Sequence, residues 1–310
     1  MRNAYLKAIY ELAKENPRII AAVADNGAIV YDKYRADFPE QFLNFGIAEA
    51  TMVSVCAGLA SCGKIPFAYT IIPFLTMRAY EQVRNDVCLQ KQNVKLIGVG
   101  AGFVYSPLGP THHATEDISI MRVLPGMTVI SPASPLETYQ ATIAAAQWDG
   151  PVYIRIAATK EPEIYEPSYS FKIGPGVTLK EGRDITVVSA GPIVYDVLQA
   201  ARELEKNQIQ VRVINLPTIK PLDREILIKA AAETGAVVTV EEHNITGGLG
   251  GAVAEVLLEA GCRPLIFERM GLDNDFCHGY GTYQDLKELN GISQADISKK
   301  LLEVYRRKGE

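Results

Sequence analysis

Short apolar runs alternate with amphipathic stretches along the whole chain. Runs without polar interruption are typical of strands buried on both faces of a sheet, whereas apolar positions at helical spacing indicate helices. The sequence predicts strands at 18–25, 64–70, 94–100, 129–130, 152–156, 184–191, 211–216 and 236–241. It predicts helices at 2–15, from 49 onward, around 79–87, at 136–147 after Ser134-Pro135, at 194–205 and from 218–223 onward. Strands that alternate with helices predict parallel sheets covered on both faces.

A segment rich in proline and glycine, from Pro162 to Gly176, interrupts this alternation. We therefore predict an α/β protein of two doubly wound domains, at residues 1–165 and 183–310, joined by a linker at 166–182. The length of 310 residues agrees with two domains, each with its own hydrophobic core.

Composition excludes several function classes. The formal net charge of −5 gives no electrostatic basis for binding nucleic acid or an anionic membrane surface. No apolar stretch is long enough to span a bilayer, and the N-terminal sequence lacks the apolar core of a signal peptide. The five cysteines are an odd number without a Cys-x-x-Cys pair, so we expect reduced thiols and no cysteine metal site. Together these features predict a cytoplasmic protein.

Glu49 stands at the head of a run, 50–60, that is apolar nearly all round. A helix of this kind is usually buried, and an acidic side chain in its first turn interacts favourably with the helix dipole. A buried carboxylate can hold or share a proton near neutral pH, which makes Glu49 a candidate catalytic residue. The alternative is an ordinary first-turn residue.

Two loops carry further candidate chemistry. Asp25 follows a predicted strand, and ligands gather at the carboxyl ends of strands in open α/β sheets, although a turn residue is the alternative. The loop at 101–118, irregular because of its glycines and prolines, carries His112 and His113 just before a helix that we expect Thr115 to cap. Adjacent imidazoles suit proton transfer or hydrogen bonding to sugar hydroxyls; surface histidines are the alternative.

The order of the motifs resembles that of the transketolase family. Residues 44–49, Asn-Phe-Gly-Ile-Ala-Glu, are similar to its N-x-G-I-x-E segment. Residues 109–125 are similar to the GPTHQ…ED…LR…P signature of transketolases and deoxyxylulose-phosphate synthases. Residues 219–223 and 241–253 resemble the C-terminal domain of transketolases. The resemblance implies a thiamine diphosphate pyrimidine-binding domain followed by a transketolase C-terminal domain.

The resemblance also implies a role for each cofactor-binding candidate. Glu49 would contact N1′ of the aminopyrimidine of thiamine diphosphate and promote the imino tautomer. Phe74 would stack on the same ring, although a core aromatic is a serious alternative. Asp25 would lie near the thiazolium, and Ile71 and Met77, on the segment of Phe74, complete the predicted cofactor set.

The resemblance assigns the two histidines to the substrate. His112 matches the GPTH histidine that touches the donor sugar, and His113, in place of the usual Gln, would do similar work. The family's acidic pair before GPTH is replaced by Pro107-Leu108, and an earlier family histidine falls on Gly100.

The arginine that binds sugar phosphate in the family falls near Ala158, where Lys160 supplies a point charge instead. With the changes before GPTH, this departure points to an altered sugar substrate, and a loss of activity is the alternative.

The chain lacks the family's G-D-G…N motif, which holds the diphosphate and Mg²⁺. The resemblance therefore implies a split enzyme whose other chain, an N-terminal transketolase subunit, holds both, with a homodimer formed through the pyrimidine domains. The glycine cluster at 247–251 matches no nucleotide motif, and His243 beside it ranks low as a site or interface residue.

We predict a thiamine diphosphate-dependent transferase that moves a two-carbon ketol unit from a ketose to an aldose acceptor. Two alternatives remain open. One is the β subunit of a 2-oxo-acid dehydrogenase decarboxylase component, although the adjacent histidines favour sugar substrates over oxo acids. The other is a noncatalytic assembly or regulatory relative, against which Glu49 and His112 argue.

Overall fold

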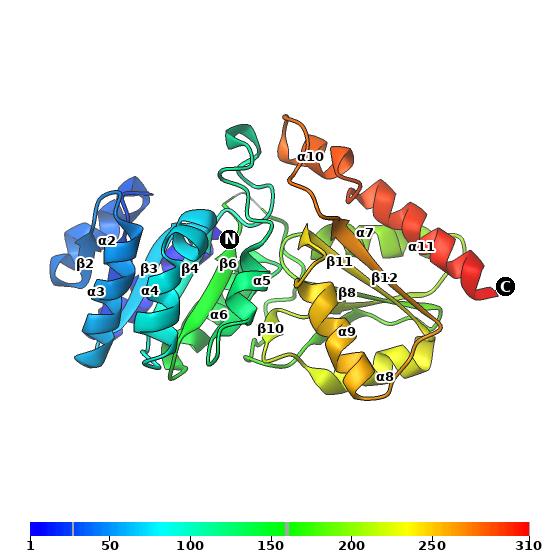
Figure 1. Cartoon of the computed structure of the whole chain (residues 1–310), viewed down its shortest axis with the longest axis horizontal. Helices are drawn as coiled ribbons and strands as arrows, with labels where there is room; N and C mark the ends of the chain where they lie inside the picture. Colours follow the sequence, from blue (N-terminus) through cyan, green and yellow to red (C-terminus); the bar gives the residue numbers. More distant parts are fainter. Residues whose placement is uncertain (27, 159–160, 310) are drawn as a thin grey trace.

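The computed structural model describes residues 1–26, 28–158 and 161–309, which form two α/β units side by side (Figure 1). Each unit is a mainly parallel sheet with helices on both faces. This arrangement confirms the predicted fold class of two doubly wound domains. Within the described ranges, none of the helices combines the length and apolar character needed to cross a bilayer.

The first sheet has seven strands among the described residues, in the order β10-β5-β6-β4-β3-β1-β2. All neighbours are parallel except β10 and β5. The strands β1, β3, β4 and β6 are buried along their whole length, as uninterrupted apolar runs predict. The strands are β1 Ile19–Val23, β2 Phe42–Asn44, β3 Ile65–Ile71, β4 Lys95–Val99, β5 Thr128–Ile130, β6 Val152–Ile156 and β10 Thr218–Lys220.

Helices α1 (Arg2–Glu15) and α6 (Pro135–Gln147) pack together on one face of this sheet. As predicted, α6 begins after Ser134, whose hydroxyl accepts a hydrogen bond from the backbone N–H of Glu137. The other face carries α3 Glu49–Ser61, α4 Tyr80–Gln82, α5 Asp117–Arg122 and the π-helical segments Phe74–Arg78 and Val83–Cys88. Short helices complete the unit at α2 Asp32–Asp37, Ala28–Tyr31, Pro39–Gln41 and Ser106–Leu108.

The second sheet has the order β12-β11-β8-β9-β7 in the described part of the chain, with β7 antiparallel. Helices α7 and α11 cover one face, and α8 and α9 cover the other. The strands are β7 Val177–Lys180, β8 Ile185–Ser189, β9 Val211–Asn215, β11 Ala236–Asn244 and β12 Ile266–Leu272. The helices are α7 Val194–Glu205, α8 Arg224–Thr234, α9 Leu249–Glu259, α10 Tyr283–Leu289 and α11 Gln294–Gly309.

The two units are joined by a strand and by a hydrophobic cluster. Residues 218–220 were expected to open a helix, but they form β10, which pairs with β5 of the first sheet, and the helix α8 begins only at Arg224. One hydrophobic cluster runs from α3 of the first unit to α8 and α9 of the second. The strand β7 falls inside the segment predicted as linker. The division at 165 and 183 stays a prediction.

Two local predictions are wrong. Thr115 does not cap α5, because the helix begins at Asp117 and the carbonyl of Thr115 instead accepts a hydrogen bond from the backbone N–H of Asn244. Helix α3 is not buried all round: Met52 and Cys56 face the sheet, whereas Val55 on the opposite face is exposed. Because the run consists of small and apolar residues, its sequence does not indicate which face of the helix packs on the sheet.

Candidate functional site

Glu49 is the first residue of α3, and its side chain is only 3% exposed. The preceding strand, β2, pairs with β1, so α3 begins beside the carboxyl ends of parallel strands. Ligands of open α/β sheets bind at this edge. Both oxygens of the Glu49 carboxylate accept hydrogen bonds from Nη1 of Arg78, each at 3.1 Å. The buried charge is therefore compensated by a cation.

Phe74 and Arg78 lie at the two ends of one π-helical segment. The guanidinium carbon of Arg78 lies 4.2 Å from the centroid of the Phe74 ring, a cation–π contact. The His112 ring also contacts Phe74, in an edge-on arrangement with 5.1 Å between the ring centroids. Glu49, Arg78, Phe74 and His112 thus form one continuous series of contacts, which we call the Glu49 cluster.

Asp25 lies at the carboxyl end of β1, in the left-handed conformation with φ of 58°. Its backbone N–H donates to Oδ1 of Asn44 at 3.1 Å, and Nδ2 of Asn44 donates to its carboxylate at 3.4 Å. Oδ1 of Asn44 also accepts from the backbone N–H of Gly46 at 3.0 Å. Asn44 therefore connects the turn of Asp25 to the start of α3.

Ile71 and Met77 flank Phe74 in the chain. Ile71 is the last residue of β3 and is buried, whereas Met77 lies on the π-helical segment and is exposed. Both residues are therefore neighbours of Phe74 in the chain, and only Met77 lies at the surface.

The two adjacent histidines face different surroundings. Nδ1 of His112 lies 3.0 Å from the Thr111 hydroxyl at the edge of the Glu49 cluster. His113 is 2% exposed and packs against Phe103, with 5.9 Å between ring centroids. Burial lowers the pKa of His113, which favours the neutral imidazole. The structure brings His112, and not His113, to Phe74.

A buried ion pair holds the base of the loop that carries both histidines. Nε of Arg155 donates to Asp117 at 3.0 Å, and the Tyr153 hydroxyl donates to the same carboxylate oxygen at 2.6 Å. Nη2 of Arg155 donates to the carbonyls of Ala114 and Glu242, at 2.8 Å and 2.9 Å. The base of the loop is therefore joined to β6 and to the second unit by buried hydrogen bonds.

The second unit supplies the rest of this base. One Glu242 oxygen accepts from the backbone N–H of Phe103 at 2.6 Å, and the other accepts from the Tyr283 hydroxyl at 2.7 Å. Nε2 of His243, which is fully buried, accepts from the backbone N–H of Ile118 at 3.1 Å. Burial raises the pKa of Glu242 to about 7 and lowers that of His243 to about 4. His243 is therefore a neutral residue of the interface between the units.

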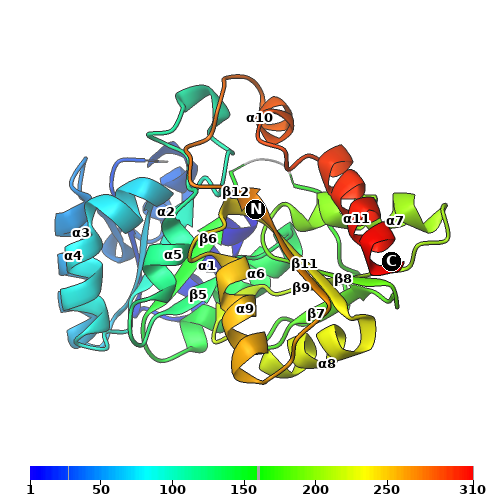
Figure 2. The same ribbon diagram turned by 45° about the vertical axis from the view of Figure 1, so that its right-hand side comes forward.

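Figures 1 and 2 both show the histidine loop and α10 rising beside one another, at the edge where the carboxyl ends of the first-sheet strands lie. The contact of Glu242 with Phe103 and Tyr283 joins these two segments. The second unit thus positions the loop, although α10 itself was not predicted.

Sequence reasoning missed Arg78, Arg155 and Glu242 as parts of this arrangement. The sequence placed Arg78 just before the predicted helix around 79–87 and four residues after Phe74, without a signal that it contacts Glu49. The contacts of Arg155 and Glu242 join segments far apart in the chain, so no local sequence pattern predicts them.

The glycine cluster after β11 makes hydrogen bonds within the protein. The Glu241 carboxylate accepts hydrogen bonds from the backbone N–H groups of Leu249 at 2.7 Å and Gly250 at 2.9 Å, at the start of α9. A helix N-terminus already engaged by a buried carboxylate does not offer those groups to a phosphate. This agrees with the absence of a nucleotide motif.

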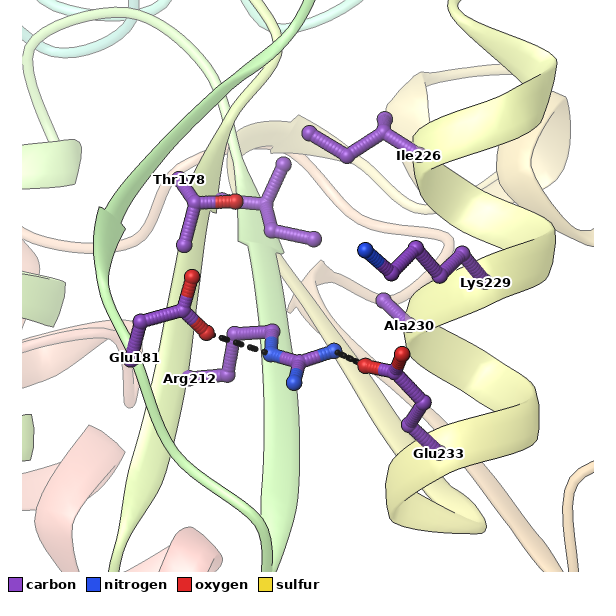
Figure 3. A pocket seen from close by; sticks show the side chains of 8 residues that line it. Thr178, Glu181, Arg212, Ile226, Lys229, Ala230 and Glu233 are labelled. Carbon is purple, nitrogen blue, oxygen red and sulfur yellow. Dashed lines mark hydrogen bonds and ion pairs between the residues drawn. The ribbon is translucent and has the colours of Figure 1, made fainter.

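A pocket in the second unit is lined by Arg212 between Glu181 and Glu233 (Figure 3). The guanidinium lies 3.4 Å from Glu181 and 2.6 Å from Glu233, so its charge is already paired. The volume of about 80 Å³ is small beside that of ordinary ligand sites. Among the residues that the structure describes, no group of three or more His, Cys, Asp or Glu side chains is placed to hold a metal ion.

Comparison with known proteins gives matches along nearly the whole chain. Residues 1–160 match the family model "Transketolase, pyrimidine binding domain" and residues 174–297 match "Transketolase, C-terminal domain". An apulose-4-phosphate transketolase subunit of Phocaeicola vulgatus is 35% identical over 99% of this chain and 97% of its own length. The 6-deoxy-6-sulfo-D-fructose transketolase subunit SqwH of a Clostridium species is 37% identical over 99% of this chain and 95% of its own. A solved structure described as "Split gene transketolase, inactive beta4 tetramer" superposes with a TM-score of 0.91, at 42% identity over 98% of both chains.

Proposed function

The chain belongs to the transketolase family, and we propose that it is one subunit of a two-chain, thiamine diphosphate-dependent ketol transferase. When bound, thiamine diphosphate supplies the carbon that accepts a two-carbon ketol unit from a ketose and delivers it to an aldose. The observation that carries the proposal is the buried Glu49 carboxylate beside the Phe74 ring, with His112 at the ring's edge.

The Glu49 cluster fits the aminopyrimidine end of the cofactor. A flat group with N–H donors already lies on Phe74 and hydrogen-bonds to Glu49, namely the guanidinium of Arg78. An aminopyrimidine is also flat and has polar nitrogens at its edge, so it suits the same pair of side chains. The sequence lacks the family's G-D-G…N motif for the diphosphate and Mg²⁺, so the proposal assigns the diphosphate end to a separate chain.

In this proposal each predicted residue has a defined task. Glu49 hydrogen-bonds to N1′ of the aminopyrimidine and holds or releases a proton there. Phe74 stacks on the ring, and Ile71 and Met77 flank it. Asp25, which follows the carboxyl end of β1, would lie toward the thiazolium end of the bound cofactor.

We assign substrate contacts to the histidine loop. His112 hydrogen-bonds to oxygens of the donor sugar, because it already lies against Phe74. His113 keeps the same role only if the loop rearranges, since its ring is buried against Phe103.

A separate chain that holds the diphosphate and Mg²⁺ completes the proposed enzyme. Two observations support this requirement: full-length relatives of about this size are themselves described as transketolase subunits, and the similar solved structure of a split-gene transketolase is described as an inactive β4 tetramer. We also propose that two copies of this chain pair through their pyrimidine domains. Exposed apolar side chains around the start of α3, those of Leu43, Ile47 and Val55, support such a contact.

The donor substrate is proposed to be a ketose other than the family's usual sugar phosphates. Pro107-Leu108 replaces the acidic pair of the family in a short helix, with Leu108 exposed. Of the two positions considered for phosphate binding, Ala158 carries no charge and Lys160 lies outside the described residues. Relatives with differently named sugar substrates support this variation.

The test is calorimetric titration with thiamine diphosphate and Mg²⁺, followed by a ketol-transfer assay, on the chain mixed with a candidate diphosphate-binding subunit. We expect cofactor binding in the mixture, and a loss of about 100-fold or more in kcat for Glu49→Gln. Glu81→Gln, on the exposed side of α4, is the matched control and should keep full activity. An unchanged rate for Glu49→Gln would favour a noncatalytic protein, and CO₂ release from pyruvate would favour the oxo-acid alternative.

A further inference from the structure

Arg78 makes two contacts that meet at one place. Its Nη1 hydrogen-bonds to both oxygens of Glu49 at 3.1 Å, and its guanidinium carbon lies 4.2 Å from the Phe74 centroid. The Arg78 side chain is 50% exposed, whereas Glu49 is 3% exposed. The arginine therefore reaches a buried carboxylate from the solvent side, and it is able to leave by the same route.

The same two groups are those that the proposed function gives to the aminopyrimidine ring. A guanidinium and an aminopyrimidine are both planar and both carry N–H donors at their edge. The Glu49 oxygens bonded to Nη1 and the Phe74 face covered by the guanidinium cannot serve a second flat group at the same time. Occupation by one group requires departure of the other.

We propose that Arg78 is an internal competitor for the aminopyrimidine site, an inference that rests on the proposed function of Glu49 and Phe74. In the free chain its guanidinium compensates the buried charge of Glu49 and lies flat on Phe74. Cofactor binding displaces it into solvent. The contacts that a partner subunit makes with the diphosphate then supply the affinity that overcomes the competition.

The size of the effect follows from the population of the competing contact. If Arg78 holds Glu49 and Phe74 for nine-tenths of the time, the apparent affinity for the cofactor is reduced about tenfold. Removing the guanidinium while keeping an unbranched apolar stem should restore that factor. Arg78→Met meets this requirement.

The experiment is calorimetric titration of the isolated chain with thiamine diphosphate and Mg²⁺. We expect Arg78→Met to bind about tenfold more tightly than the wild-type chain. Arg84→Met is the matched control, because Arg84 is exposed on the neighbouring π-helical segment and its side chain donates to Asn85, away from Glu49 and Phe74. It should bind as the wild type does.

Binding by Arg78→Met that is equal to or weaker than wild-type binding would overturn the inference, as would undetectable binding by both isolated chains. If the wild-type chain still binds the cofactor with a partner subunit, the proposed function survives and Arg78 alone is reassigned. Absence of binding with and without the partner would overturn both.

Discussion

Glu49 is buried and Arg78 is half exposed, so water can solvate the charge of Arg78 but not that of Glu49 if the ion pair is broken. Replacing Glu49 leaves an arginine that water solvates, whereas replacing Arg78 leaves a buried carboxylate without its cation. We expect Arg78→Met to lower the free energy of unfolding by about 1–2 kcal/mol, and Glu49→Gln by less than about 1 kcal/mol. Urea denaturation of both variants measures the asymmetry, and equal losses would contradict it.

Gly102 lies where the histidine loop packs against the Glu242 side chain of the second unit. It has φ of +56°, and a Cβ there would lie 2.2 Å from the carboxylate of Glu242. The Glu242 carboxylate is held by Phe103 and Tyr283, so it has no free direction in which to move. A Cβ at residue 102 therefore requires the Glu242 carboxylate or the loop backbone to shift, which disturbs these hydrogen bonds.

We predict that Gly102→Ala destabilises the protein by about 3 kcal/mol, from backbone strain and the disturbed Glu242 contacts together. Gly126→Ala is the control, because Gly126 has φ of +76° but no atom within 4 Å of its Cβ position. It should cost only about 1–2 kcal/mol, the strain alone. Thermal and urea unfolding of both variants provide the comparison, and equal losses would show that Glu242 yields easily.

At the scale of elements, uninterrupted apolar runs predicted the central strands correctly, because a strand buried on both faces leaves its mark in its own sequence. The strand Thr218–Lys220 was misread, since its place is decided by pairing with β5, which no local pattern records. The site followed the same rule. Glu49, Phe74 and His112 were predicted from motifs, whereas Arg78 depends on how the π-helical segment lies against α3.

Helix α8 offers a test of the element that follows this misread strand. Asp223 caps the helix by accepting from the backbone N–H of Ile226 at 3.2 Å, and it also accepts from the backbone N–H of Gly176 at 2.9 Å. Asp223→Ala should lower the free energy of unfolding by about 1–2 kcal/mol. Glu225→Ala, in the same first turn without a capping contact, should cost less than about 0.5 kcal/mol. Denaturant titration separates the two, and similar values would argue against the cap.

At the scale of the whole molecule, titratable residues of the second unit hold the base of the histidine loop. Burial raises the pKa of Glu242 from 4.5 to about 7, so the folded protein binds this proton more tightly than the unfolded chain. The contribution of Glu242 to stability is present below pH 4.5 and is lost as the pH rises toward 7. His243, with its pKa lowered from 6.5 to about 4, acts in the opposite sense: its contribution is lost as the pH falls through that window.

Replacing Glu242 by Gln separates its contribution to the pH dependence of stability from that of His243. Gln keeps the acceptor oxygen for Phe103 but does not titrate, so Glu242→Gln should gain stability relative to the wild type between pH 5 and pH 7.5, by about 2 kcal/mol. Glu288→Gln, exposed on α10, should show no such pH-dependent difference. Urea unfolding at both pH values measures the change. A difference between wild type and Glu242→Gln that does not vary with pH would mean that Glu242 is ionised throughout, and that the two units are joined there by a charge rather than by a shared proton.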